Sequence, residues 1–142
     1  MGISKVSDFV ASGFFKPKEH MNDLALLIEP VSVARNQPNT YQGKTTTRDE
    51  VLANISVFAN QADVEAGKPS QVLRNYKVVH GMLTSTLEQV LGGAIISNVE
   101  KINTQNGSGY VFRDVKDAAI FAKVEGYYDN REAAAASAPS FD

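Results

Sequence analysis

A continuous run of apolar residues covers positions 24–28, and Glu29 and Pro30 follow it directly. A run of this length, bounded by polar residues and a proline, is typical of a buried strand and too short for a buried helix. The next stretch, residues 31–47, is mostly polar and ends in a run of threonines. Its composition predicts a long mobile loop after the strand.

Two more strands are predicted downstream of this loop. Apolar and polar side chains alternate over residues 50–59, which is the period of a half-buried strand. Residues 61–70 are mainly polar and include a glycine and a proline, so they predict a solvated connection. Residues 72–79 return to the composition of a strand, and we expect them to form the third one.

The hydrophobic period then changes to that of a helix. Starting from Leu83, four apolar residues fall at positions i, i+4, i+7 and i+8, so residues 81–91 predict a short amphipathic helix. The two glycines at 92–93 end this pattern as a helix stop would. Residues 94–102 and 110–113 predict the two strands of a hairpin, joined by a glycine-rich turn.

Both ends of the chain carry helical patterns. Residues 4–12 predict a short helix that Gly13 ends. Asp114 can cap a final helix, with Asp117 at its third position. The apolar stripe of that helix would consist of Ile120, Phe121, Val124, Tyr127 and Tyr128. Small residues dominate the last stretch, so we expect one domain over residues 1–132 and a flexible low-complexity tail over 133–142.

Without its ends, the predicted order is three strands, a short helix and two strands. This is the order of the OB-fold, a small barrel of Greek-key topology. The sequence therefore predicts a mainly β fold of the α+β kind. In detail, we expect an OB-fold-like five-stranded Greek-key barrel with a helix between strands 3 and 4, plus short N- and C-terminal helices.

Several short motifs accompany this order. They are Phe15, Pro17, residues 26–30, Tyr41 with Gly43, the glycines at 92–93, and residues 110–112. Together they resemble phage-encoded OB-fold single-stranded-DNA-binding proteins, and the resemblance covers residues 14–125. It implies non-sequence-specific binding of single-stranded DNA in phage replication or recombination, in the cytoplasm of the host cell.

Charge and composition add modest constraints. The net charge is -2, but residues 30–113 hold 8 basic and 6 acidic residues, whereas residues 114–142 hold 3 basic and 6 acidic ones. A weakly basic body with an acidic end suits a protein that holds nucleic acid on one surface. Cysteine is absent, which excludes disulfides and is compatible with the cytoplasm. No stretch approaches the roughly 20 apolar residues of a membrane span, so no membrane partner is expected.

Non-specific binding of a single strand needs aromatic faces for bases and cations for phosphates. Nine residues are the candidates for DNA binding: Arg35, Tyr41, Lys44, Arg48, Arg74, Tyr76, Lys77, Tyr110 and Arg113. On a regular third strand, Arg74 and Tyr76 share a face and Lys77 projects from the other. The alternative is core packing for each tyrosine and a solvated surface charge for each cation. Phe14 and Phe15 are expected to pack a strap against the core, with stacking on a base as the alternative.

No catalytic site is predicted. The glycine, lysine and threonine at 43–45 lack the first glycine of a phosphate-binding loop, because Pro38 stands five residues before them. His20 and His80 have no ligand partner at helical spacing, so neither a metal nor another cofactor is expected. The runner-up function is that of a virion or tail structural subunit, and homo-oligomers are compatible with either function.

The chain ends in serine, phenylalanine and aspartate at residues 140–142. This end is similar to the acidic, aromatic-tipped extensions with which many single-stranded-DNA-binding proteins recruit replication proteins. The cluster of acids that usually precedes such a tip is missing here, and only one acid follows the phenylalanine. An inert tail is therefore the alternative to the recruitment of replication partners.

Overall fold

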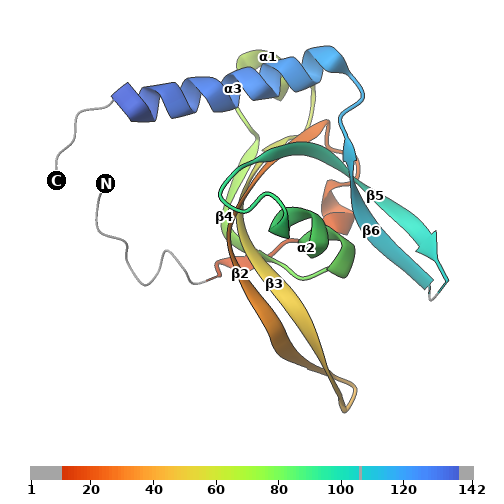
Figure 1. The fold of residues 1–142 in the computed structure, drawn as a ribbon. Helices are drawn as coiled ribbons and strands as arrows, with labels where there is room; N and C mark the ends of the chain where they lie inside the picture. The colour runs from red at the N-terminus through yellow and green to blue at the C-terminus, as the bar shows by residue number, and fades with distance from the viewer. Residues whose placement is uncertain (1–10, 106, 138–142) are drawn as a thin grey trace.

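The computed structural model describes residues 11–105 and 107–137, apart from the side chains of Tyr41 and of residues 132–137. The chain is mainly β, as expected, with a six-stranded sheet and three α-helices (Figure 1). The elements in order are β1 (Gly13–Phe14), the 3-10 helix η2 (Pro17–His20), β2 (Ala25–Tyr41), β3 (Lys44–Phe58), α1 (Gln61–Ala66), β4 (Gln71–Val78), α2 (Gly81–Glu88), β5 (Ile95–Thr104), β6 (Gly107–Asp114) and α3 (Ala118–Ser137).

The sheet is mixed and open rather than a closed barrel of five strands. Its order is β1-β4-β3-β2-β5-β6, and every neighbouring pair is antiparallel except β1 with β4. The unpredicted strand β1 occupies the outer edge of β4, and in the described part of the chain no ladder joins β4 to β6. Helix α2 contacts β3 and β6, so it lies between the two halves of the curved sheet (Figure 1).

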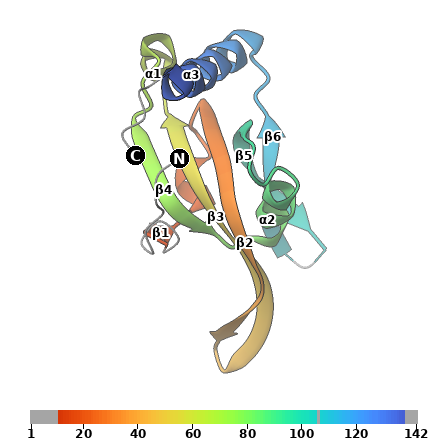
Figure 2. The same ribbon diagram turned by 60° about the vertical axis from the view of Figure 1, so that its left-hand side comes forward.

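Strands β2 and β3 form one long hairpin whose outer part projects from the body (Figure 2). The prediction of a mobile loop over residues 31–47 is therefore wrong. The turn consists of Gln42 and Gly43, which both have positive φ, at 50° and 77°. Two positive φ angles in a two-residue turn match the right-handed twist of paired strands. The β-branched threonines at 45–47 then continue the pairing as strand residues.

Two cores cover the two faces of β2, which explains its uninterrupted apolar run. The inner core consists of Phe15, Leu26, Ile28, Val51, Ala53, Ile55, Val57, Val78, Leu83, Leu87 and Val99. The outer core consists of Ala25, Leu27, Phe58, Val64, Val115, Ile120 and Val124. Leu26 and Ile28 point inward toward α2, whereas Leu27 points outward toward α1 and α3. Successive strand residues alternate between faces, so a strand that is buried on both faces needs apolar residues at every position.

The helices bear out two predictions and correct two. The amphipathic helix after residue 80 and the final helix are confirmed as α2 and α3. The connection over residues 61–70 contains α1, which Asn60 caps by accepting a hydrogen bond from the Asp63 amide. Asp117, not Asp114, caps α3, because its Oδ1 accepts hydrogen bonds from the amides of Ala119 and Ile120.

The predictions for the two termini fall largely outside the described residues. Only residues 11–12 of the expected leading helix over 4–12 are described, and they are not helical. At the other end, α3 continues to Ser137. Residues 133–137 of the predicted tail are therefore helical, and the remainder lies outside the described part. None of the helices that the structure describes is long and apolar enough to cross a membrane.

Candidate nucleic-acid interface

The structure spreads the predicted cations over several elements and pairs most of them with carboxylates. Arg113 Nε on β6 lies 2.7 Å from Glu100 Oε2 on β5. Lys44 beside the hairpin turn and Arg74 on β4 are exposed. Within the described residues, neither of these two has an acidic partner within 4 Å. An ion-paired cation must leave its carboxylate to bind a phosphate, so the predicted set does not form one basic surface.

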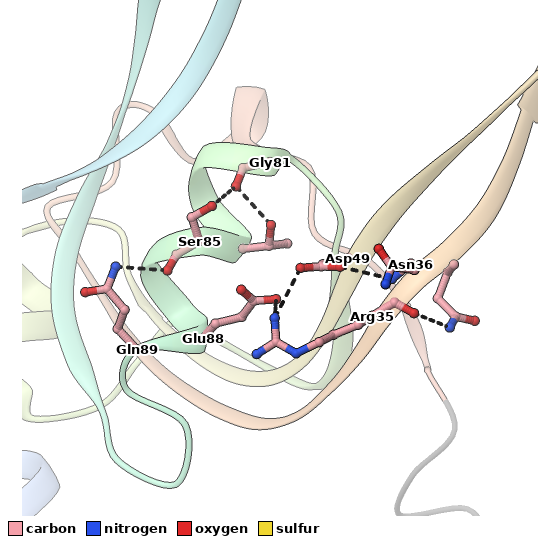
Figure 3. A network of polar contacts seen from close by, with 9 residues as sticks. Arg35, Asn36, Asp49, Gly81, Ser85, Glu88 and Gln89 are labelled. Carbon is pink, nitrogen blue, oxygen red and sulfur yellow. Dashed lines mark hydrogen bonds and ion pairs between the residues drawn. The ribbon is translucent and has the colours of Figure 1, made fainter.

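Arg35 belongs to a polar network between the hairpin and α2 (Figure 3). Its Nη1 lies 3.6 Å from Asp49 Oδ2 and 3.3 Å from Glu88 Oε1. The Asn36 amide donates to Asp49 Oδ1 at 3.0 Å and, with the hydrogen bond from Glu88, lowers the pKa of Asp49. The same hydrogen bond, followed by burial, raises the pKa of Glu88. Arg35 thus holds carboxylates from β3 and α2, and the network ties the hairpin to α2.

The opposite pKa shifts of Asp49 and Glu88 predict a pH dependence of stability. A carboxyl group whose pKa is raised on folding stabilises the fold below its unfolded pKa, near 4.5 for Glu88, and loses that contribution as the pH rises through the folded pKa. The lowered pKa of Asp49 has the opposite effect. Its contribution to stability is present at neutral pH and is lost only as the pH falls through the pKa of Asp49 in the folded state. We expect Glu88→Gln to remove the loss above pH 4.5, because an amide keeps a donor for Asp49 without titrating.

Urea unfolding of both proteins between pH 4 and pH 7 measures this difference. The matched control is Glu100→Gln, which removes an exposed glutamate of the Arg113 pair and should keep the parental profile above pH 4.5. If Glu88→Gln follows the parental curve throughout, the carboxyl pair does not contribute to stability.

Glu50 holds two more of the predicted DNA contacts. Its carboxylate lies 3.1 Å from Arg48 Nε and 3.0 Å from Lys77 Nζ. Burial raises the pKa of Glu50, but the hydrogen bonds from Lys77 and Arg48 outweigh it and lower the pKa overall. Glu50 is therefore ionised at neutral pH and neutralises much of the positive charge of these two side chains.

Tyr76 lies on β4 opposite Ala53, on the side of the inner core, and is half-buried. A Cβ atom added at Gly13 would lie 3.2 Å from the Tyr76 ring, so the backbone of β1 covers that ring. Asn75 has a φ of 55°, at an irregularity in the β3–β4 pairing. This irregularity interrupts the alternation on which the predicted shared face of Arg74 and Tyr76 depends. Tyr76 therefore packs part of its ring against β1, which leaves it less available to a base than an exposed ring.

Tyr110 is the predicted aromatic residue that does reach a hollow of the surface. It lines a pocket of about 370 Å³, here called the seam pocket, where the strap between β1 and η2 passes the end of β4 and meets β6. The lining residues are Phe14, Phe15, Lys16, Pro17, Lys18, Glu19, Val79, His80 and Tyr110. The side chain of Tyr41, the third predicted tyrosine, lies outside the described part of the structure.

Aromatic rings dominate the seam pocket. Phe14 has 51% of its surface exposed, and Lys77 Nζ lies 5.5 Å from the centre of its ring. Tyr110 contacts His80 edge to face, with ring centres 5.4 Å apart. Burial, followed by the charge of Arg48, lowers the pKa of His80, so this ring is neutral at pH 7. The pocket thus combines an open aromatic face with neutral rings of a kind on which bases stack.

Lysines surround these rings. Lys16 and Lys18 line the pocket and are exposed, and Glu19 is its one acidic lining residue. With Lys77 beside Phe14, three lysines lie within the immediate surroundings of the pocket. A nucleotide could therefore place its base on Phe14 and its phosphate near a lysine.

The nine residues predicted to bind DNA do not include Phe14, Lys16, Lys18 or His80, although stacking on a base was the alternative considered for Phe14. The sequence-based prediction placed both phenylalanines in a strap on the core, which is correct for Phe15 and wrong for Phe14. The local signal was the short stretch of two phenylalanines followed by lysine, proline and lysine, since it joins rings and cations without an acid.

The structure gives His20 a structural position. Its Nδ1 lies 2.7 Å from Asp23 Oδ2, and its ring stacks on Phe15 with centres 5.1 Å apart. Among the residues that the structure describes, no group of three histidine, aspartate or glutamate side chains is arranged to hold a metal ion.

The chain was compared with protein-family models, with curated proteins and with solved structures. None of the three comparisons gives a match. The rings and lysines of the seam pocket, the arrangement of the strands and the ion pairs are therefore the features that indicate a function.

Proposed function

We propose that the protein binds single-stranded DNA without sequence preference, at the seam pocket and the adjoining outer face of β4. The observation that carries this proposal is the exposed ring of Phe14, with Lys77 over it and Lys16 and Lys18 nearby. Base stacking on an aromatic ring contributes about 1–3 kcal/mol per base and tolerates every sequence, because every base has a flat face. A role in phage replication or recombination, in the host cytoplasm, belongs to the same proposal.

The arrangement of the strands supports the proposal. Strands β2, β3, β4, β5 and β6, with α2 before β5, have the order and the neighbours of an OB-fold. We infer that the strap around β1 and side-chain packing close this barrel between β4 and β6. In OB-folds the second and third strands carry the face that binds oligonucleotides. Their counterparts here are β3 and β4, which carry Glu50 and Lys77 beside Phe14.

The ion pairs determine how strongly the affinity for DNA should depend on salt. Arg35, Arg48, Lys77 and Arg113 are engaged with carboxylates, which leaves Lys16 and Lys18 as the lysines that line the pocket. Each phosphate contact with a single strand contributes about -0.7 to the slope of log K against log salt. Two contacts therefore predict a slope of about -1.4, so stacking should retain part of the affinity in high salt.

A fluorescence titration with labelled oligothymidine at several salt concentrations tests the proposal. We expect the single strand to bind more tightly than the matching duplex, because a duplex does not offer its bases for stacking. Preference for the duplex, or no binding at low salt, would contradict it. The proposal describes a binding module and assigns no reaction to the pocket.

A structural subunit is the second candidate, and the long hairpin favours it. Beyond residue 36 on β2 and before residue 49 on β3, these strands pair only with each other among the described residues. Their outer edges could pair with neighbouring copies. Sizing at rising protein concentration separates the two functions, because a structural subunit should form large assemblies without DNA.

A further inference from the structure

A second hollow lies between α3 and the start of β5 and shares no lining residue with the seam pocket. It has a volume of about 400 Å³ and is here called the α3 groove. Its lining residues are Leu27, Ala94, Ile95, Ile96, Asp114, Phe121, Glu125, Tyr128 and Asp129. The DNA-binding proposal makes no use of any of them.

The floor and one wall of the α3 groove are apolar. Ile95 and Ile96 are half-buried on β5. Phe121 keeps 37% of its surface exposed although it is a large apolar residue. Phe121, Glu125 and Tyr128 have the spacing i, i+4 and i+7, so they line the groove from one face of α3. An apolar side chain of a partner would find a matching surface here.

The groove also borders an open edge of the sheet. Ile95 and Ile96 pair with Ile28 and Leu27 of β2, but the β5–β6 ladder begins only at Ser97 with Asp114. Described residues therefore provide no strand on the other side of Ile95 and Ile96. In an antiparallel ladder, successive residues direct their N–H and C=O groups to opposite neighbours. One of these two residues thus presents an amide and a carbonyl to an incoming strand.

The rim of the groove is acidic. Asp114, Glu125 and Asp129 are all exposed and line it, and among the described residues no lysine or arginine does. Three carboxylates repel a nucleic acid and attract a cationic chain. This charge distinguishes the α3 groove from the lysine-bearing seam pocket.

We propose that the α3 groove binds an extended, basic segment of a partner protein. Apolar side chains of that segment contact Phe121 and Ile96, its backbone extends the sheet at the edge of β5, and its lysines or arginines face the acidic rim. Adding a strand to an open edge is a recurring mode of peptide recognition, in which backbone bonds give affinity and side-chain pockets give specificity. The inference does not depend on DNA binding at the seam pocket.

The test uses the full chain and a fluorescein-labelled heptapeptide, lysine-arginine-valine-isoleucine-valine-arginine-lysine, followed by anisotropy. Two control peptides replace its basic ends with glutamate and aspartate, or its central isoleucine with proline. We expect the basic peptide to bind at least about tenfold more tightly than either control. The acidic rim repels the acidic ends of the first control, and the proline of the second control cannot donate a backbone hydrogen bond to the edge of β5.

Variants locate the binding. Glu125→Lys combined with Asp129→Lys should weaken the basic peptide about tenfold, and Phe121→Ala should weaken it about fivefold. Glu100→Lys, a charge reversal at an exposed residue outside the groove, should leave it unchanged. Each variant is first checked for an unchanged melting temperature.

Three results would overturn the inference. They are equal binding of the basic and acidic peptides, full binding by the double charge-reversal variant, and a dimer of the protein that Phe121→Asp dissociates. The last result would assign the groove to a second copy of the chain.

Discussion

Replacing Phe14 with alanine should weaken binding of single-stranded DNA about tenfold or more while the protein stays folded. The ring has 51% of its surface exposed, so its removal opens little of the core. Loss of one base stack costs about 1–3 kcal/mol, and about 1.4 kcal/mol corresponds to a factor of ten in affinity. The loss should persist in high salt, because stacking does not release counterions.

Two variants make this prediction specific. Phe14→Tyr keeps a flat ring and the contact with Lys77, so it should bind oligothymidine almost as well as the parent. Phe121→Ala removes another exposed phenylalanine, on α3, and should not change DNA binding. If Phe14→Ala binds like the parent whereas Tyr110→Ala does not, the stacking ring lies on β6. If neither variant loses affinity, the seam pocket is not the DNA site.

Replacing Phe15 with alanine should cost about 3–5 kcal/mol of the free energy of unfolding, the usual range for a buried phenylalanine. Phe15 has 1% of its surface exposed and belongs to the inner core with Leu26 and Val78. It also stacks on His20, at 10° between ring planes. Alanine would leave a cavity that these neighbours fill only in part, and a loss of this size is a large part of the stability of a small domain.

The neighbouring position supplies the control. Phe14→Ala should cost less than about 1 kcal/mol, as substitutions at exposed residues usually do. Urea unfolding followed by circular dichroism compares the two variants, which differ by one position and remove the same side chain. Equal costs would mean that the strap does not hold Phe15 in the core.

The sequence determined those elements whose pattern is local. The alternation over residues 50–59, the apolar run at 24–28 and the helical period after residue 80 each follow from the packing of one element against a core. These features predicted α2 and the inner parts of β2 and β3, and the glycine-rich turn predicted the β5–β6 hairpin. Each of these patterns lies within one short segment, so it can be recognised without the contacts that the segment makes with distant residues.

The outer part of the β2–β3 hairpin lacked such a signal. Its residues are mostly polar on both faces, so no alternation distinguishes them from a loop. Their strand conformation comes from backbone pairing across the turn at Gln42 and Gly43. The order of polar and apolar residues along a single strand gives no signal of that pairing. The helix α1 was missed for a related reason. It has six residues and one buried residue, Val64, which is too few to show a helical period of apolar positions.

Tertiary structure alone decided the candidate site. Phe14 and Phe15 are identical in type and adjacent in sequence, and only the course of the strap past β4 buries one ring and exposes the other. Carboxylates distant in sequence form ion pairs with the predicted cations, since Glu88 pairs with Arg35 and Glu50 pairs with Lys77. Whether a ring or a cation is available to a ligand depends on which groups the fold brings against it, and that is a property of packing rather than of residue type.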